Sequence, residues 1–272
     1  MPVDHGTLSR MLETAVVAAR LAGQRAMEEL NFIKASIKST DEMVTQADGR
    51  CQQIIIDRIK ETYPDHGFLA EEGPGGMMFK QLPRGSDQFW WVIDPIDGTN
   101  NFAHQMLFFA VSIAVCYQGE PILGVIFDPP TDSMFTAVKD GEAQLNGRRI
   151  RASDETINRF SSIGLDSHTD CKMADWVYQI MSRTRYRNLG TTALQLAYVA
   201  RGSLVATIVS RAKLWDFAAG ALICQAAGAI FTDWKSQAVF PVNLDAYESA
   251  EFKVVASNRK IQPELMQIMQ SR

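Results

Sequence analysis

The chain has little cysteine and no long uninterrupted hydrophobic run. None of its apolar segments reaches the length of a membrane-spanning helix, and its first residues lack the charged stretch and apolar run of a secretory signal. The few cysteines are widely scattered and fall mostly in apolar segments, which favours reduced thiols over a disulfide framework. We therefore expect a cytoplasmic protein that does not enter a membrane. The cysteines are Cys51, Cys116, Cys171 and Cys224.

Histidine is equally scarce, and the signatures of several enzyme classes are missing. The histidines have no metal-ligand spacing and no neighbouring nucleophile signature, so we interpret them as structural or surface residues. The sequence contains no G-x-S-x-G elbow, no G-x-x-x-x-G-K-[ST] loop and no G-x-G-x-x-G fingerprint. These absences argue against zinc enzymes, serine hydrolases and common nucleotide-binding folds. The histidines are His5, His66, His104 and His168.

A strong excess of charge is also absent. The formal net charge is -4, which argues against a general nucleic-acid or membrane surface. Arginines cluster at 148–151 and 183–187, and we interpret the second cluster, which alternates with Thr184 and Tyr186, as a solvated face or interface rather than an RNA site. A content of 46% hydrophobic residues over 272 positions can bury one large domain or two halves that share a core.

Against this background, one segment combines a buried strand with acidic side chains. Four large apolar residues, 90–93, predict a strand buried on both faces, and Pro95 and Gly98 predict that it stops and turns there. Asp94 and Asp97 therefore lie at a strand end, where α/β proteins bind ligands. Turn chemistry alone explains these aspartates equally well, because aspartate often bonds its own backbone in turns.

Two further acidic positions lie at the ends of predicted elements. Glu71 and Glu72 follow the apolar residues 68–70, which predicts a second strand end with carboxylates. Asp216 precedes a run of small and apolar residues that predicts a buried helix, in the place of an N-cap. Helix capping is a sufficient reason for an aspartate there. A cap can nevertheless face a cleft, where the helix N-terminus favours anions such as phosphate.

The acidic positions suit hard metal ions. Magnesium takes oxygen ligands and is held by a few carboxylates together with water and substrate phosphate. Such ions can lower the pKa of a bound water and neutralise phosphoryl oxygens, which is what hydrolysis of a phosphate ester requires. Dispersed Asp and Glu without His or Cys therefore predict magnesium rather than zinc.

Taken together, these motifs resemble the inositol monophosphatase family of magnesium-dependent, lithium-sensitive sugar phosphatases. The resemblance rests on segments 94–102, 71–72 and 215–220, with a weaker match at 44–48. It implies an α/β (α+β) protein, a five-layered α-β-α-β-α sandwich, with an N-terminal half at 1–150 that carries most metal ligands. It also implies a C-terminal half at 151–272, one catalytic unit between the halves, and a homodimer.

The resemblance also implies a set of metal ligands. Glu71, Asp94 and the backbone carbonyl of Ile96 hold a first magnesium ion, and Asp94, Asp97 and Asp216 hold a second. Glu71 contacts a weaker third ion. Two to three ions are thus expected.

Catalytic and substrate residues follow from the same resemblance. Thr99, paired with Asp48 and assisted by Glu71, activates the attacking water, since an unassisted threonine is a poor base. The backbone amides of Gly98 and Thr99 receive the phosphate. The segment Gly190-Thr191 corresponds to the substrate wall.

Periodicity and turn signals predict helices and strands along the whole chain. The N-terminal half begins with two helices followed by strands, and the C-terminal half alternates the two. We predict helices at 6–31, 46–62, 170–183, 191–201, 216–228 and 261–270, and strands at 68–71, 90–94, 108–117, 122–128, 134–138, 160–165, 186–189, 203–209, 229–233 and 252–256.

The substrate is less constrained than the reaction. In inositol monophosphatases a glutamate seven residues before the second-signature aspartate bonds inositol hydroxyls, and here that position is Val209. Arg211 and Lys213 could instead meet a second anionic group. We expect a small phosphate ester, inositol monophosphate or a related sugar or polyol phosphate, with weak discrimination in favour of inositol phosphate because a valine cannot accept hydrogen bonds from its hydroxyls. Alternative substrates on the same fold are fructose 1,6-bisphosphate, a 3'(2'),5'-bisphosphate nucleotide and histidinol phosphate. The bisphosphate nucleotide is disfavoured because the nucleotidase branch of the family usually has a lysine where this chain has Asn100. A third possibility is an interaction protein for the transcription machinery.

Overall fold

The computed structural model describes residues 3–33, 35–37, 43–85, 88–166 and 174–270, so Cys171 and His168 lie outside the described residues. The helices are α1 (His5–Glu29), α2 (Gln46–Lys60), α3 (Thr99–Ala103), α4 (Asp175–Arg183), α5 (Thr192–Ala200), α6 (Leu214–Ala226) and α7 (Gln262–Gln270). The strands are β1 (Ala35–Ile37), β2 (Met43–Thr45), β3 (Gly67–Ala70), β4 (Phe79–Gln81), β5 (Phe89–Asp97), β6 (Ala110–Tyr117), β7 (Glu120–Asp128), β8 (Ser133–Val138), β9 (Gln144–Leu145), β10 (Arg148–Arg149), β11 (Ser162–Leu165), β12 (Arg185–Arg187), β13 (Ala206–Ala212), β14 (Ile230–Asp233) and β15 (Phe252–Ser257).

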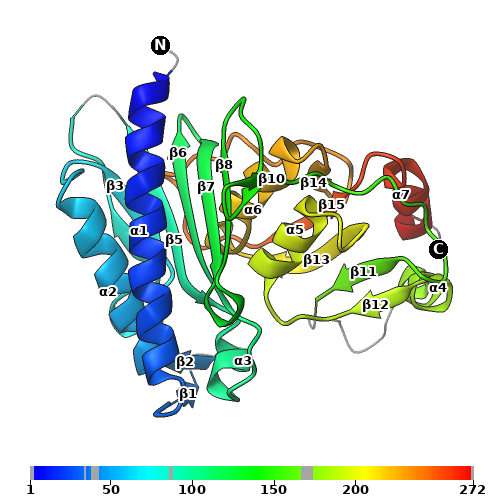
Figure 1. Ribbon diagram of the computed structural model, residues 1–272, viewed down its shortest axis with the longest axis horizontal. Helices are drawn as coiled ribbons and strands as arrows, with labels where there is room; N and C mark the ends of the chain where they lie inside the picture. Colours follow the sequence, from blue (N-terminus) through cyan, green and yellow to red (C-terminus); the bar gives the residue numbers. More distant parts are fainter. Residues whose placement is uncertain (1–2, 34, 38–42, 86–87, 167–173, 271–272) are drawn as a thin grey trace.

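The elements form five layers, as predicted (Figure 1). Helices α1 and α2 pack on one face of a sheet with the order β10-β9-β8-β7-β6-β5-β3-β4. Helices α5 and α6 fill the space between that sheet and a second one, of order β12-β11-β13-β15-β14. Helices α4 and α7 cover the outer face of the second sheet. The α-β-α-β-α sandwich is confirmed.

Each layer follows from its sequence pattern. Helix α1 buries one stripe, including Leu8, Met11, Ala15 and Ala22, against the first sheet. Helix α6 is buried almost all round because it lies between two sheets, which its small and apolar composition allows. Gly124 on β7 permits close packing of these layers, since a Cβ there would lie 2.6 Å from the Ala219 carbonyl oxygen.

Strand directions bring the predicted site residues to shared edges. In the first sheet β3 and β5 are parallel, so their carboxyl ends meet at one edge. In the second sheet β12, β11 and β13 are mutually parallel, with β11 in the middle. Strands β15 and β14 complete it in antiparallel pairs.

One prediction about a strand end was wrong. Strand β5 does not stop before Pro95 but runs on to Asp97, with a shift in its register against β6 between Asp94 and Asp97. This bulge accommodates a proline, which has no N–H to give to a ladder. The neighbouring β3 has already ended at Ala70, so only one side of β5 needs pairing there.

Several short elements escaped prediction. Strands β1, β2, β4, β9 and β10 and helix α3 are each five residues long or fewer, too short for a periodic pattern. The helix predicted at 170–183 begins at Asp175 in the described chain. No helix among the described residues has the length and apolar character needed to cross a bilayer.

Candidate active site

Four acidic residues from three separate elements interact at one edge of the sandwich. Glu71 follows β3, Asp94 and Asp97 lie at the end of β5, and Asp216 lies in the first turn of α6. Electrostatic repulsion couples Asp94 to the other three, and couples Asp216 to Asp97 and Glu71. The predicted metal-binding carboxylates are thus brought together from both halves of the chain.

Burial and mutual repulsion disfavour negative charge in this cluster. Asp94 is only 2% exposed, and its pKa is raised well above the usual value by burial, then by Glu71, Asp97 and Asp216. The pKa of Asp216 is raised by burial and by Asp97 and Glu71, against a smaller opposite effect of Lys213. Asp94 also shares a hydrogen bond with the Glu71 side chain, which raises its pKa further.

Hydrogen bonds from the backbone fix three of these carboxylates. Asp94 Oδ1 accepts from the Ile96 N–H at 3.0 Å, and Asp216 Oδ2 accepts from the Lys213 N–H at 2.8 Å. Asp97 Oδ2 accepts from the Ala193 N–H at 2.6 Å and from the Thr191 hydroxyl, which caps α5. The second half of the chain therefore orients an aspartate of the first.

The donor set fits a hard divalent cation. Its members are carboxylate oxygens, with no imidazole or thiolate among them, which is the ligand chemistry of magnesium. No three Asp, Glu, His or Cys side chains in the described part of the chain are grouped tightly enough to form a metal cage as they stand. The fit rests instead on the raised pKa values of Asp94 and Asp216, because a cation would offset the cost of burial and the repulsion that raise them.

A second pair, Asp48 and Thr99, lies beside this cluster. Asp48 is fully buried in the first turn of α2, where its Oδ2 accepts from the Thr45 N–H at 2.8 Å and from the Thr45 hydroxyl at 2.5 Å. Its Oδ1 lies 3.1 Å from the Thr99 hydroxyl oxygen, which is also 3.0 Å from the Ile96 carbonyl oxygen. Burial raises the pKa of Asp48 to about 6 although the Thr45 bonds lower it.

Tight backbone geometry surrounds Thr99. Gly98 has a φ of 98° and a Cβ there would lie 2.9 Å from the Phe108 carbonyl oxygen, so only glycine fits. Gly190 has a φ of 67°, and a Cβ there would press on the Asn101 side chain. Asn101 donates from Nδ2 to the carbonyl oxygens of Phe108 and Leu189, both at 2.7 Å. The predicted substrate residues Gly98 and Gly190 are thus adjacent.

The chain matches one known protein family over nearly its whole length. The profile of the inositol monophosphatase family matches residues 7–272. The chain belongs to this family. The Nus factor SuhB of Escherichia coli is 36% identical over 234 residues, covering 82% of this chain and 85% of that protein.

Two solved structures of related proteins show the same fold. The extragenic suppressor protein suhB from Bartonella henselae aligns with a TM-score of 0.83 and 29% identity, over 96% of this chain and 99% of that one. The IMPase from Thermotoga maritima aligns with a TM-score of 0.82 and 29% identity, over 96% of each chain. The recognition of an inositol monophosphatase family member from the sequence is confirmed.

Some local predictions within this family member need correction. Asp216 is not the N-cap of α6, because the helix begins two residues earlier and Asp216 bonds back to the backbone of Lys213. The cations offered for a second anionic group are also engaged. Arg211 lies 3.0 Å from Glu251, and Lys213 donates to the Ser249 carbonyl oxygen at 2.8 Å.

Sequence reasoning missed the residues that hold the acidic ones in place. Thr191 was expected at the substrate wall, and the structure shows that its hydroxyl bonds Asp97. The Ala193 N–H and the Asn101 amide also escaped prediction. Only Asn101 carried a signal, because it falls within the first signature segment. The other contacts join residues more than ninety positions apart, so no local pattern reports them.

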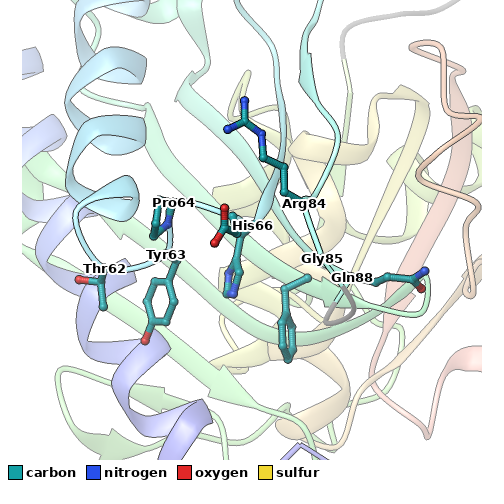
Figure 2. A pocket seen from close by; sticks show the side chains of 9 residues that line it. Thr62, Tyr63, Pro64, His66, Arg84, Gly85 and Gln88 are labelled. Atoms are coloured by element: carbon teal, nitrogen blue, oxygen red, sulfur yellow. The ribbon is translucent and has the colours of Figure 1, made fainter.

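A hollow of about 320 Å³ lies elsewhere, at the amino ends of β3 and β5 (Figure 2). Its wall includes Tyr63, whose ring stacks on His66 with centroids 4.8 Å apart. His66 Nδ1 accepts from the Trp91 indole N–H at 3.0 Å, which supports a structural role for this histidine. Figure 2 shows the Arg84 side chain pointing away from these rings. The hollow is therefore separate from the carboxylate cluster at the opposite strand ends.

Proposed function

We propose that this protein is a magnesium-dependent phosphomonoesterase that hydrolyses inositol monophosphate or a related small sugar or polyol phosphate. The observation that carries the proposal is the interaction of four acidic residues beside the pair formed by Thr99 and the buried Asp48. Phosphate ester hydrolysis needs cation ligands and a base for water in one place, and this arrangement offers both. Membership of a family of magnesium-dependent phosphatases supports the same reaction.

The cation ligands we propose are those expected from the resemblance. Glu71, Asp94 and the Ile96 carbonyl oxygen would hold one magnesium ion, Asp97 and Asp216 would join Asp94 around a second, and Glu71 would contact a third. Bound magnesium lowers the pKa of a coordinated water and neutralises phosphoryl oxygens. Hydrogen bonds from Thr191 and Ala193 hold the Asp97 carboxylate in place, which supports this proposal.

The remaining residues act on the water and the phosphate. Thr99 would accept a proton from the attacking water as its own hydroxyl proton passes to Asp48, whose Oδ1 is 3.1 Å away. Asp48, with a pKa of about 6, is mostly ionised at neutral pH and can take that proton. Glu71 assists. The amides of Gly98 and Thr99 would bind the phosphate, and Gly190-Thr191 would line the substrate.

The decisive experiment is a panel of phosphate esters assayed with and without magnesium. We expect magnesium-dependent release of phosphate from inositol 1-phosphate or another small sugar or polyol phosphate. Arg211 and Lys213 contact Glu251, which weakens the case for a bisphosphate substrate. Preference for fructose 1,6-bisphosphate, a bisphosphate nucleotide or histidinol phosphate would identify that ester as the substrate of the same site. No release from any ester would reject the enzymatic proposal.

A second candidate function is an interaction with the transcription machinery. The observation that favours it is the 36% identity to a relative called a Nus factor. Pull-down of nascent transcription complexes with the wild-type protein and the Asp97→Asn variant tests this role. Capture by both supports a function independent of catalysis, and capture by neither rejects it.

We further propose a cytoplasmic homodimer. The described cysteines Cys51, Cys116 and Cys224 are buried free thiols, which suits a reducing compartment. The dimer is proposed from the family resemblance alone. Light scattering coupled to size exclusion measures it directly, and a monomeric mass at micromolar concentration would reject it.

A further inference from the structure

The strand order of the second sheet places an unassigned carboxylate at the candidate active site. Strands β12, β11 and β13 are parallel, so their carboxyl ends share one edge. The chain after β12 leads to Thr191, which bonds Asp97, and the chain after β13 leads to Asp216. Strand β11 lies between these two, and the residue directly after it is Asp166. Substrates of α/β sheets bind outside the carboxyl ends of such strands.

Other side chains at this edge are already engaged. Val209 is 1% exposed and packs in the core between the sheets, so it cannot meet a ligand. Arg211 pairs with Glu251 at 3.0 Å. Lys213 donates to Ser249 and lies 3.4 Å from the same glutamate. These contacts remove the cations and the valine as candidates for holding the organic part of a substrate.

Asp166, in contrast, is held in place through one of its two carboxylate oxygens. Its Oδ2 accepts from the Ser210 N–H at 2.6 Å and from the Ser210 hydroxyl at 2.7 Å. Its Oδ1 makes no hydrogen bond with any residue the structure describes, and the side chain is only half-buried. The two bonds from Ser210 fix the carboxylate before a ligand arrives, which lowers the entropy that binding must overcome.

The backbone groups that hold the two aspartates at this edge are close together in the chain. Ser210 and Lys213, whose N–H groups bond Asp166 and Asp216, are three residues apart. Three extended residues span at most about 11 Å. A shift in the pairing of β13 with β15 between Val209 and Ala212 interrupts this stretch. A phosphate at the metal-binding carboxylates can therefore carry a hydroxylated group that extends toward Asp166.

We propose that Asp166 is a specificity-determining residue that accepts hydrogen bonds from hydroxyl groups of a sugar or polyol phosphate. This inference rests on the proposed phosphatase function. A carboxylate accepts strongly from hydroxyl donors, so Asp166 supplies the acid that position 209 lacks, from the neighbouring strand. It acts on the alcohol part of the substrate and takes no part in the attack on phosphorus.

The test compares two esters that share a ring. Inositol 1-phosphate carries ring hydroxyls, and cyclohexyl phosphate carries none. We expect Asp166→Asn to raise KM for inositol 1-phosphate by about tenfold or more, the effect of losing a charge-assisted hydrogen bond. Its kcat/KM for cyclohexyl phosphate should stay within about twofold of the wild type. The matched control is Asp154→Asn, because Asp154 is exposed and lies away from this edge. This variant should change kcat/KM for neither ester.

Each result that departs from this expectation has a distinct meaning. Equal losses on both esters would show that Asp166 only supports the strand, and no loss on either would also overturn the inference. If the wild type releases phosphate from none of the esters tested, the phosphatase function itself is rejected, and this inference with it. If Asp166→Asn does not fold, the wild-type kcat/KM ratio of the two esters decides, since a ratio below about tenfold contradicts a hydroxyl acceptor.

Discussion

The hydroxyl of Thr99 lies 3.1 Å from Asp48 Oδ1, although the two residues are 51 positions apart in the chain. Each lies in the first turn of a helix, Asp48 in α2 and Thr99 in α3. The bonds from Thr45 occupy Asp48 Oδ2, so the other oxygen of Asp48 is directed at Thr99. This contact turns a weakly basic hydroxyl into part of a proton acceptor.

Removal of the Thr99 hydroxyl should therefore lower turnover rather than folding. We expect Thr99→Ala to reduce kcat by about 10²- to 10⁴-fold, the usual contribution of general-base catalysis. Thr99→Ser keeps the hydroxyl and is the matched control, with kcat within about tenfold of the wild type. Steady-state assays with saturating magnesium measure both. A Thr99→Ala enzyme that retains kcat within about twofold would remove this pair from the mechanism.

Replacing Asp94 or Asp216 by a neutral residue should abolish the effect of magnesium on both activity and thermal stability. For Asp94→Asn and Asp216→Asn we expect loss of phosphate release and of the rise in Tm on adding magnesium. In the presence of a chelator their Tm should not fall below that of the wild type, because each change removes a buried, repelled charge. Thermal unfolding with and without magnesium measures this. Full activity in either variant would contradict the ligand assignment.

Burial of these carboxylates, with repulsion added at Asp94 and Asp216, predicts how stability depends on pH. The pKa values of Asp94 and Asp216 are raised well above the usual value, and those of Asp97 and Asp48 are raised to about 6. The folded protein thus holds these protons more tightly than the unfolded chain. Their contribution to stability is complete below about pH 4 and is lost as pH rises through the folded pKa values.

In a chelator, this part of the stability should be smaller at about pH 8 than at about pH 5.5. Added magnesium should raise Tm more at the higher pH, because ionised carboxylates bind the ion. Calorimetry at both pH values, with and without magnesium, gives the two differences. A magnesium effect that shrinks as pH rises would show that these carboxylates do not hold the ion.

The sequence predicted the longer helices and strands and the acidic positions for a physical reason. Strands such as β5 and helices such as α1 carry patterns long enough to read, and Asp94 and Asp97 lie within one contiguous segment. The five-layered order itself came from the family resemblance. The placement of Glu71 next to Asp94 then follows from two parallel strands that end at one edge.

The contacts that orient the acidic side chains could not be predicted from the sequence in the same way. The bond from Thr191 to Asp97 joins residues 94 positions apart, and each residue has a local explanation as a cap or a turn. Pro95 signalled a strand end, yet a bulge let β5 continue through it, because pairing on one side had already ceased. Tertiary packing decided both cases, and a single sequence does not record it.

We propose that the two halves of the chain, 1–150 and 151–272, form one cooperative unit. Asn101 joins them, since its amide donates to Phe108 in the first half and to Leu189 in the second, both at 2.7 Å. Asn101→Ala leaves both carbonyl oxygens without this donor, and we expect a loss of about 2 to 4 kcal/mol in unfolding free energy. Activity should also fall, because Leu189 precedes the segment that holds Asp97.

The neighbouring Asn100 is exposed and serves as the control, so Asn100→Ala should lower the unfolding free energy by less than about 0.5 kcal/mol. Urea unfolding followed by tryptophan fluorescence and by circular dichroism should give coincident single transitions for all three proteins. Two separate transitions in the wild type would show that the halves fold independently and that Asn101 joins two domains.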